Sequence, residues 1–573
     1  MPKNQRSYER EITLRPDTTV NLNHGKRTKR LTVVAKTKDG KEFKLKYRKV
    51  SDNQIRITNH VDSAVKLKVT VTPMEPLDNK GWYKTAQAAA RVLMMVRNVS
   101  VSYRNQYSLS LPGFMPTIGD AFGQTRGNGL LSPGLDFAFG MIGDSYIDKA
   151  KRNDWLLMND SVATPASTHQ ATDLQLKMTL EPVRNLKIDL TASRTENKSK
   201  SIQYMYTGNP TTQSGTFTMT TLSLKSAFEG IGNAENGYHS ASFEKFCQSL
   251  DAFRDRVEAQ YAGATYPAGT PLAGKPYDPA NGAVGKYSAD VMVPAFLSAY
   301  TSMGGHSLSI FPSLARLLPN WTLRYSGLAK LPWFSDVFKS FNINHSYRSV
   351  YAVGSYSTYS TFMEFMNGLG FVTDATTGNP VPNSMYNVSS VSINEAFSPL
   401  LGVDMTFHNN LTAKLEYRTT RVLNLSMTSV QLNEATSHDW VLGMGYRINN
   451  FRLFGAQPKR KVKTRVDSAK DTKSQATGSQ SARGGLNNDL NLRLDISYRK
   501  QANISRDIAT VCSFASSGNT AFKLSFMADY TLSRLLTMSF YYDSQTNTPL
   551  LTSSSYPTTT HDFGLSLKFS LTR

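Results

Sequence analysis

The chain has 573 residues and a mass of 63.6 kDa, which is long for one ordinary soluble domain. Charged residues make up 19% of it, below the roughly 25% of a typical soluble protein. The longest apolar stretch lies near Val92–Val96, far shorter than the ~20 residues that a membrane-spanning helix needs. The composition therefore excludes a helical membrane protein, and any membrane crossing has to use β-strands.

The charge balance is strongly basic, with 65 Lys and Arg residues against 43 Asp and Glu residues and a formal net charge of +22. Such a chain can bind nucleic acid, anionic lipid or acidic glycan. Nucleic-acid binding needs basic residues concentrated on one face or helix, but here they are spread along alternating strands, apart from a run at 459–465. We therefore expect no nucleic-acid partner.

The start of the chain is charged and strand-like. Residues 1–6 lead into it without the apolar core of a secretory signal, so we expect either a cytoplasmic protein or a piece of a longer one.

Residues 12–73 have the pattern of a small soluble β segment. Its clearest part is a hairpin of Leu31–Lys36 and Glu42–Arg48 around the turn Asp39-Gly40, a favoured two-residue turn. The domain prediction is a soluble strand-rich segment, 1–80, followed by a barrel region, 81–573.

From residue 98 onward the sequence alternates between apolar and polar residues with the period of two that is typical of β-strands. The first such run is 98–111, and a tight antiparallel hairpin follows at 173–180 and 186–191. Further strands with this pattern are predicted at 215–225, 321–327, 341–353, 397–407, 411–417, 440–448, 490–498, 522–530, 536–542 and 563–571.

These segments indicate a transmembrane antiparallel β-barrel, since a tilted strand of about 9 to 11 residues spans the apolar band of an outer membrane. One parity carries polar and charged residues, which should line a wet lumen because a charge facing lipid at the midplane costs ~2 to 4 kcal/mol. The predicted lumen-facing residues are Arg104, Gln106, Lys177, Asp189, Lys414, Glu416, Arg418, Arg447, Arg493, Asp495 and Lys523.

The other parity is apolar and carries aromatic residues toward the strand ends. These are expected to face lipid and to form the aromatic girdle of a barrel. The predicted lipid-facing residues are Tyr103, Tyr107, Trp321, Trp440, Tyr446, Tyr542, Phe563 and Phe569.

The strand directions leave one inconsistency. If the short turns at 408–410 and 531–534 are periplasmic, then 215–225 and 321–327 run in the same direction. Either a further strand lies between them or one of the two segments is not a strand. The further strand would raise the thirteen recognised strands to fourteen.

Two insertions interrupt the strand pattern. Ser242–Tyr261 has apolar residues at helical spacing and predicts an amphipathic helix. A second helix is expected at Ala289–Ser302. Both belong to a helical insertion near 239–305. Residues 458–485 are rich in Lys, Ser, Gln and Gly without periodicity, so a disordered periplasmic loop is predicted there.

We find no pattern that indicates catalysis. The nine histidines are scattered without metal-ligand spacing, and Cys247 and Cys512 are far apart and form no CxxC pair. The cluster Gly127-Asn128-Gly129 lacks the context of a phosphate-binding loop. The sequence therefore predicts no enzyme activity, no metal, no cofactor and two unpaired cysteines.

An ordered set of motifs makes the chain resemble a known family. The set resembles the C-terminal part of the Sov/SprA outer-membrane translocon of the type IX secretion system, and the resemblance covers nearly the whole chain. The motifs are Leu111-Pro112-Gly113-Phe114, Ser132-Pro133-Gly134-Leu135-Asp136-Phe137-Ala138-Phe139-Gly140, Asp154-Trp155-Leu156, Val293-Pro294-Ala295-Phe296, Asn320-Trp321-Thr322-Leu323, His345-Ser346-Tyr347-Arg348-Ser349 and Asn488-Asp489-Leu490-Asn491-Leu492-Arg493-Leu494-Asp495.

The resemblance implies a place in the outer membrane of a Gram-negative bacterium and a role in exporting folded proteins to the cell surface, including adhesins in gliding bacteria. It also implies a PorV-type shuttle barrel, a periplasmic plug protein and cargo with C-terminal secretion domains as partners, beside the lipid bilayer. Members of the family are several times longer and begin with a signal peptide, so we expect a C-terminal fragment.

Two alternatives remain open. The chain could be a self-contained porin or substrate channel of about fourteen strands, or a surface adhesion or structural barrel that uses long loops at 112–170 and 361–395.

Overall fold

The protein is described by a computed structural model. It describes residues 7–16, 18–28, 30–59, 62–73, 94–117, 119, 122–127, 130–158, 164–205, 211–302, 307–366, 368–449, 451, 489–532, 535–551 and 555–570. The predicted loop at 458–485 lies outside these residues.

The chain divides into two compact units, 1–95 and 96–573. The domain boundary predicted at residue 80 lies within 74–93, outside the described residues.

The first unit consists of two small antiparallel sheets, ordered β1-β7-β3-β4 and β2-β6-β5. One side of each sheet is apolar, and Leu14, Val69 and Ile55 are fully buried between them. The strands are β1 (Tyr8–Leu14), β2 (Val20–Asn23), β3 (Leu31–Thr37), β4 (Glu42–Phe43), β5 (Tyr47–Lys49), β6 (Gln54–Ile57) and β7 (Val65–Pro73).

The hairpin predicted in this unit is confirmed, but its second strand is shorter than predicted. Ala35 pairs with Phe43 and Lys36 with Glu42, and β4 then ends. Tyr47–Lys49 belongs to the other sheet, where β5 pairs with β6. In a fold of two packed sheets the chain has to pass from one sheet to the other. The alternation of apolar and polar residues does not change at this passage, so the sequence does not show where β4 ends.

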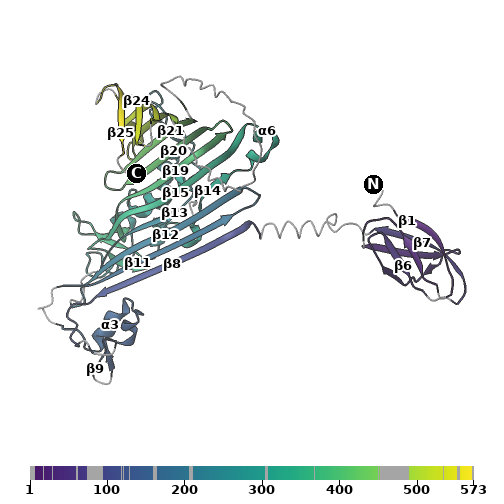
Figure 1. Cartoon of the computed structure of the whole chain (residues 1–573). Coiled ribbons are helices and arrows are strands. Elements are labelled where there is room, and N and C mark those ends of the chain that lie inside the picture. The colour runs from purple at the N-terminus through teal and green to yellow at the C-terminus, as the bar shows by residue number, and fades with distance from the viewer. Residues whose placement is uncertain are drawn as a thin grey trace. The chain divides into compact units, whose positions relative to one another are not determined.

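The second unit is built on one antiparallel sheet of 13 strands, in which all thirteen predicted strands are present. The all-β fold is therefore confirmed. Figure 1 shows the long strands lying side by side in chain order, from β8 in blue to β25 in yellow. The strands are β8 (Val96–Ser110), β11 (Ala166–Leu180), β12 (Leu186–Ile202), β13 (Thr212–Thr220), β14 (Asn320–Tyr325), β15 (Phe338–Thr358), β19 (Tyr386–Phe407), β20 (Leu411–Ser426), β21 (Gln431–Ile448), β22 (Leu490–Asp507), β23 (Cys512–Thr531), β24 (Leu536–Pro549) and β25 (Thr558–Phe569).

The inconsistency in strand direction disappears because β13 and β14 share one position in the sheet. Both lie between β12 and β15 and are antiparallel to both strands. On β12, Arg194 pairs with Met219 of β13 and Thr191 pairs with Asn320 of β14. The two strands are halves of one strand that residues 221–319 interrupt, so the expected fourteenth strand was wrong, and the described strands fill twelve positions.

The strands are also longer than predicted. β15 has 21 residues, β19 has 22 and β23 has 20, compared with the 9 to 11 that the alternating segments suggested. The predicted segments are only the parts in which one parity is uniformly apolar. Beyond these parts the same parity becomes mixed, and the period of two is harder to recognise.

The two long loops predicted at 112–170 and 361–395 are largely ordered structure. The first contains β9 (Thr125–Gly127), β10 (Leu130–Ser132), α2 (Leu135–Ala138) and α3 (Ser145–Arg152) and ends within β11. The second contains a three-stranded sheet of β16 (Met363–Met366), β17 (Leu369–Thr373) and β18 (Pro380–Ser384), and then β19 begins.

The interrupting segment 221–319 is a helical insertion, as predicted. It contains α4 (Ala241–Glu258), η3 (Ala259–Tyr261), η4 (Pro279–Asn281), α5 (Ala289–Tyr300) and η5 (Leu314–Arg316). Ser240 caps the N-terminus of helix α4: its hydroxyl accepts a hydrogen bond from the Phe243 amide and so satisfies one free N–H of the first turn. Two short helical turns, η6 (Leu328–Lys330) and α6 (Pro332–Ser335), connect β14 to β15.

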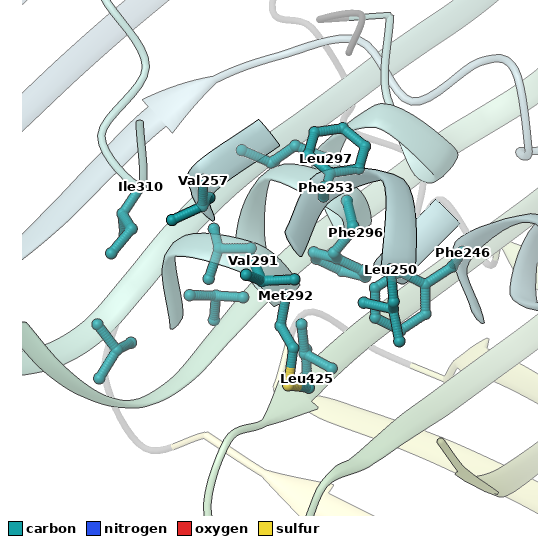
Figure 2. Close-up of a cluster of buried hydrophobic side chains, with 14 of the residues drawn as sticks. Phe246, Leu250, Phe253, Val257, Val291, Met292, Phe296, Leu297, Ile310 and Leu425 are labelled. Carbon is teal, nitrogen blue, oxygen red and sulfur yellow. The ribbon is translucent and has the colours of Figure 1, made fainter. Parts of the chain in front are cut away.

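The insertion packs directly on the sheet. Phe246 and Leu250 of α4 and Phe296 of α5 gather over Leu425 of β20, as Figure 2 shows. The Phe296 ring meets Phe246 edge to face at 6.1 Å. None of the described helices is long and apolar enough to cross a membrane.

This packing gives a prediction. Substituting Phe296 with alanine removes a fully buried ring, which should destabilise the insertion by about 3 to 5 kcal/mol. We expect 221–319 to become sensitive to protease in the otherwise folded protein, as measured by timed digestion and mass spectrometry. Leu314→Ala changes an exposed residue of the same insertion and is the control; equal sensitivity of both variants would contradict the packing.

Candidate functional site: two faces of one sheet

The strand register decides which side chains share a face, because directly paired residues of antiparallel strands point to the same side of a sheet. Following the pairs from β8 to β25 places all eleven polar residues predicted for the lumen on one face. We call this the polar face. All eight predicted aromatic residues are on the opposite face, here called the apolar face. That the polar face lines a lumen and the apolar face contacts lipid stays a prediction.

Ion pairs link neighbouring side chains along the polar face. Glu416 accepts from Lys414 at 2.8 Å and also pairs with Arg418. Arg493 pairs with Asp495 at 2.7 Å, and Arg447 pairs with Asp489. In each of these ion pairs the partners are two residues apart on one strand or belong to neighbouring segments of the chain.

The polar face is hollowed near a bulge in β19. A cleft of about 670 Å³ lies where the pairing of β19 with β20 skips from Phe397 to Leu401. Arg324, Asp404 and Lys414 contribute to its lining. Arg104, Gln106, Lys177 and Lys523 lie on other strands of the same face and do not line this cleft.

The apolar face has a broad band of exposed apolar side chains on the halves of the strands near the short turns. Trp440 is 50% exposed and stacks on Tyr417 at 4.5 Å, and Phe563 is 77% exposed. Trp321 stacks on Tyr347 at the same distance. Trp321 and Trp440 lie near the middle of strand positions rather than at their ends, because the strands continue well beyond the predicted segments.

The helical insertion covers the other half of the apolar face on the central strands of the sheet. On β20, Leu423 and Leu425 are buried beneath it, whereas Leu415 is exposed. On β22, Ala502 and Ile504 are buried, whereas Tyr498 is exposed. One continuous strand face therefore passes from an exposed apolar band to a contact with protein.

A buried ion cluster joins the insertion to this face, and the sequence analysis did not identify it. Glu434 of β21 accepts hydrogen bonds from Arg421 at 2.7 Å and from Arg506 at 2.8 Å. The side chains of Glu434 and Arg506 are 2% and 0% exposed. The arginines also donate to carbonyl oxygens of the insertion, Arg421 to that of Ser226 and Arg506 to that of Tyr238. The sequence signal that could have identified it is three charged residues on a largely apolar parity of neighbouring strands.

A second buried polar network lies beside the strand break. The carboxylate of Glu395 accepts from Ser223 at 2.8 Å and from Tyr347 at 2.9 Å, and Ser223 also contacts Ser349. The amide of Thr221 donates to the Ser349 carbonyl, and the Asn320 side chain accepts from the Ser349 amide. These bonds satisfy the backbone of β15 where β13 has ended and β14 has not yet begun.

Glu229 connects this anchored loop to helix α4. Its carboxylate accepts from the Ser240 hydroxyl at 2.8 Å and from the Ser242 amide at 3.0 Å. Burial opposes ionisation of Glu229, but the hydrogen bonds from Ser242 and Ser240 and the charge of Arg421 hold its pKa below the ordinary value.

Both cysteines are free; Cys247 is buried and Cys512 is exposed. Within the ranges that the structure describes, no three His, Cys, Asp or Glu side chains are placed to hold a metal ion.

Comparison with known proteins finds no matching family model and no curated protein with a significant match. Two similar solved structures are the β domain of the Bordetella autotransporter BrkA and OmpT, an outer membrane protein of Vibrio cholerae. The first is 8% identical over 71% of this chain and 92% of that chain, with a TM-score of 0.19; the second is 9% identical over 70% and 89%, with a TM-score of 0.17. Both are outer-membrane β-barrel proteins, but at these scores the similarity carries no argument about this chain.

The buried ion cluster gives a prediction about stability. Glu434→Gln leaves two buried guanidinium groups without a counter-charge, which should destabilise the protein by about 3 to 5 kcal/mol. Chemical denaturation, monitored by the protease sensitivity of residues 221–319, measures this loss of stability. Asp251→Asn breaks exposed ion pairs with Lys286 and Arg254 and should change stability by less than about 1 kcal/mol. Equal effects would mean that the cluster does not anchor the insertion.

The lowered pKa of Glu229 predicts a dependence on pH. A carboxyl group with a depressed pKa in the folded state stabilises that state above its unfolded pKa, near 4.5, and loses this contribution as the pH falls through the folded pKa. The insertion should therefore become more sensitive to an acid-active protease below pH 4.5. In Glu229→Gln this change should be smaller, with lower protection already at neutral pH; an unchanged pH profile would contradict the role of Glu229.

Proposed function

We propose that the second unit forms part of the wall of an outer-membrane β-barrel that conducts proteins, as in the type IX secretion system. The observation that carries the proposal is the separation of the faces: one continuous antiparallel sheet presents an exposed apolar band on one side and ion-paired polar residues on the other. Water on both sides would make such a band unfavourable, whereas lipid on one side and a wet lumen on the other fits both faces.

The backbone supports the same proposal. Every strand of the sheet order is paired on both sides except β8 and β25, which are its two ends, and no pair joins them within the described residues. Unpaired backbone N–H and C=O groups are strongly unfavourable in hydrocarbon. A wall of this kind therefore needs partner strands at both edges, which a larger barrel would supply.

The transport step needs no chemical reaction of this chain. The polar face would keep the lumen wet, and its ion pairs would hold charged side chains against the wall instead of leaving them to bind a passing polypeptide. The type IX assignment, with a PorV-type shuttle barrel, a periplasmic plug protein and cargo carrying C-terminal secretion domains, rests on the motif resemblance. Enzymatic activity is not part of the proposal.

The porin alternative differs in how the two edge strands, β8 and β25, are paired. A self-contained barrel requires β8 to pair with β25, so cysteines placed on both edges would cross-link within one chain. A larger wall would keep these edges apart.

Adjacent residues of β20 allow a direct test of the wall. In a variant with Cys247→Ala and Cys512→Ser, a cysteine at Lys414 lies on the polar face and one at Leu415 on the apolar face. A bulky water-soluble maleimide should label Lys414→Cys in intact outer membranes and inhibit export of cargo with C-terminal secretion domains. Leu415→Cys should resist this reagent and react with a lipid-soluble maleimide.

The outcomes separate the parts of the proposal. Equal labelling of both positions by the water-soluble reagent would exclude a membrane wall. Face-specific labelling that leaves cargo export unchanged would support a wall but contradict protein conduction.

A further inference from the structure

We propose that the edge of the helical insertion nearest the exposed apolar band binds the phosphate groups of anionic membrane lipids. The proposal deepens the proposed function and rests on it, because it takes the apolar face as the lipid-facing side of the wall. It assigns the basic residues at this edge to the headgroup layer of the adjacent leaflet.

The helical insertion lies on the apolar face of the sheet. Its buried contacts on the sheet, including Phe217, Val391 and Leu425, are all on the apolar face. The insertion therefore lies on the side of the sheet that carries the exposed band, not on the polar side. On the lipid-facing side of a wall, protein that covers half of the central strands leaves the other half of those strands for the bilayer.

Apolar side chains remain exposed at the edge of the area that the insertion covers. Phe228 of the insertion is 68% exposed, and its ring lies 5.3 Å from that of Phe397 on β19. Leu401, the next residue of β19 in register on this face, is exposed. The insertion thus ends with an exposed aromatic ring at the start of the apolar band, which is where aromatic residues sit at membrane interfaces.

The same edge carries basic residues. Lys225 lies three residues before Phe228 and donates to the Ser298 carbonyl at 3.4 Å. Burial lowers the pKa of Lys225, and the nearby Lys245 of α4 lowers it further. Neither lysine has a carboxylate within ion-pair distance in the part of the chain that the structure describes.

Lys500 adds a third lysine from the sheet itself. It is exposed on the apolar face of β22, between exposed Tyr498 and buried Ala502, and therefore marks the boundary of the covered area. Its cross-strand partner is His438, whose ring stacks on Tyr417. Lys500 likewise has no carboxylate partner among the described residues.

Several other basic residues of this face are paired. Arg194 and Lys198 share Glu196, and Lys200 pairs with Asp144. Lys225 and Lys500, by contrast, lie next to the exposed aromatic band without a carboxylate partner among the described residues. An ammonium group above an aromatic belt fits a lipid phosphate, which supplies the missing negative charge while the acyl chains contact the band below.

Trp440 provides a local probe, since it is exposed on β21 and paired with Tyr498, two residues from Lys500. We would reconstitute the full chain in mixed vesicles of phosphatidylcholine and phosphatidylglycerol, with bromine on the acyl chains of one lipid at a time. The quenching that Trp440→Phe abolishes reports the lipid next to this site. We expect preferential quenching by the brominated phosphatidylglycerol.

Charge reversal tests the lysines. Lys225→Glu and Lys500→Glu should each reduce the preference for phosphatidylglycerol about fivefold, the effect of one basic residue near a membrane surface. Lys500→Arg should retain it. Lys38→Glu makes the same change of net charge in the first unit and should leave the preference unchanged.

The outcomes are distinguishable. Quenching of Trp440 by both lipids without preference, or a preference that Lys225→Glu and Lys500→Glu leave intact, would overturn the lipid-phosphate site and leave the wall in place. Absence of quenching by either lipid would overturn the proposed function itself. Loss of the preference upon addition of inorganic phosphate, at constant ionic strength, would show a site for free phosphate instead of lipid.

Discussion

The buried cluster of Arg421, Glu434 and Arg506 is the interaction on which the division of the apolar face depends. Two guanidinium groups and one carboxylate lie on a face that is apolar farther along the same strands. In lipid such groups would be strongly unfavourable, so this part of the face has to be covered by protein. The arginines also donate to backbone carbonyls of the insertion, which satisfies donors that Glu434 alone does not.

The interrupted strand places the covering segment where it is needed. Because the insertion leaves the sheet at Thr220 and returns at Asn320, both its ends emerge inside the sheet and not from a loop at its edge. The Glu395 network and the contacts of Ser349 close the gap with hydrogen bonds. A long insertion is thus accommodated without leaving the neighbouring strands unpaired, and its two helices lie directly on the strands beside the break.

Together these features divide the apolar face into two environments. Near the short turns the face is exposed and aromatic, which matches a bilayer. Beyond the aromatic residues its central strands are covered by helices, which ion pairs and hydrogen bonds hold in place. The opposite face stays polar along its length, with ion pairs such as Lys414–Glu416. A channel wall taller than the membrane it crosses has this arrangement, and the strands of 20 or more residues are long enough to form one.

The sequence by itself determined the two faces, because the period of two is local and assigns each residue to a side whatever the neighbouring strand. It therefore predicted all thirteen strands, the helices at 242–261 and 289–302, and the partition between residues such as Lys414 and Trp440. Only the tertiary structure decided that 215–225 and 321–327 share one position, that the strands continue beyond their apolar segments, and that the insertion lies on the apolar face. Those facts depend on pairing and burial between residues far apart in the chain, such as Arg506 and Tyr238, to which local alternation is insensitive.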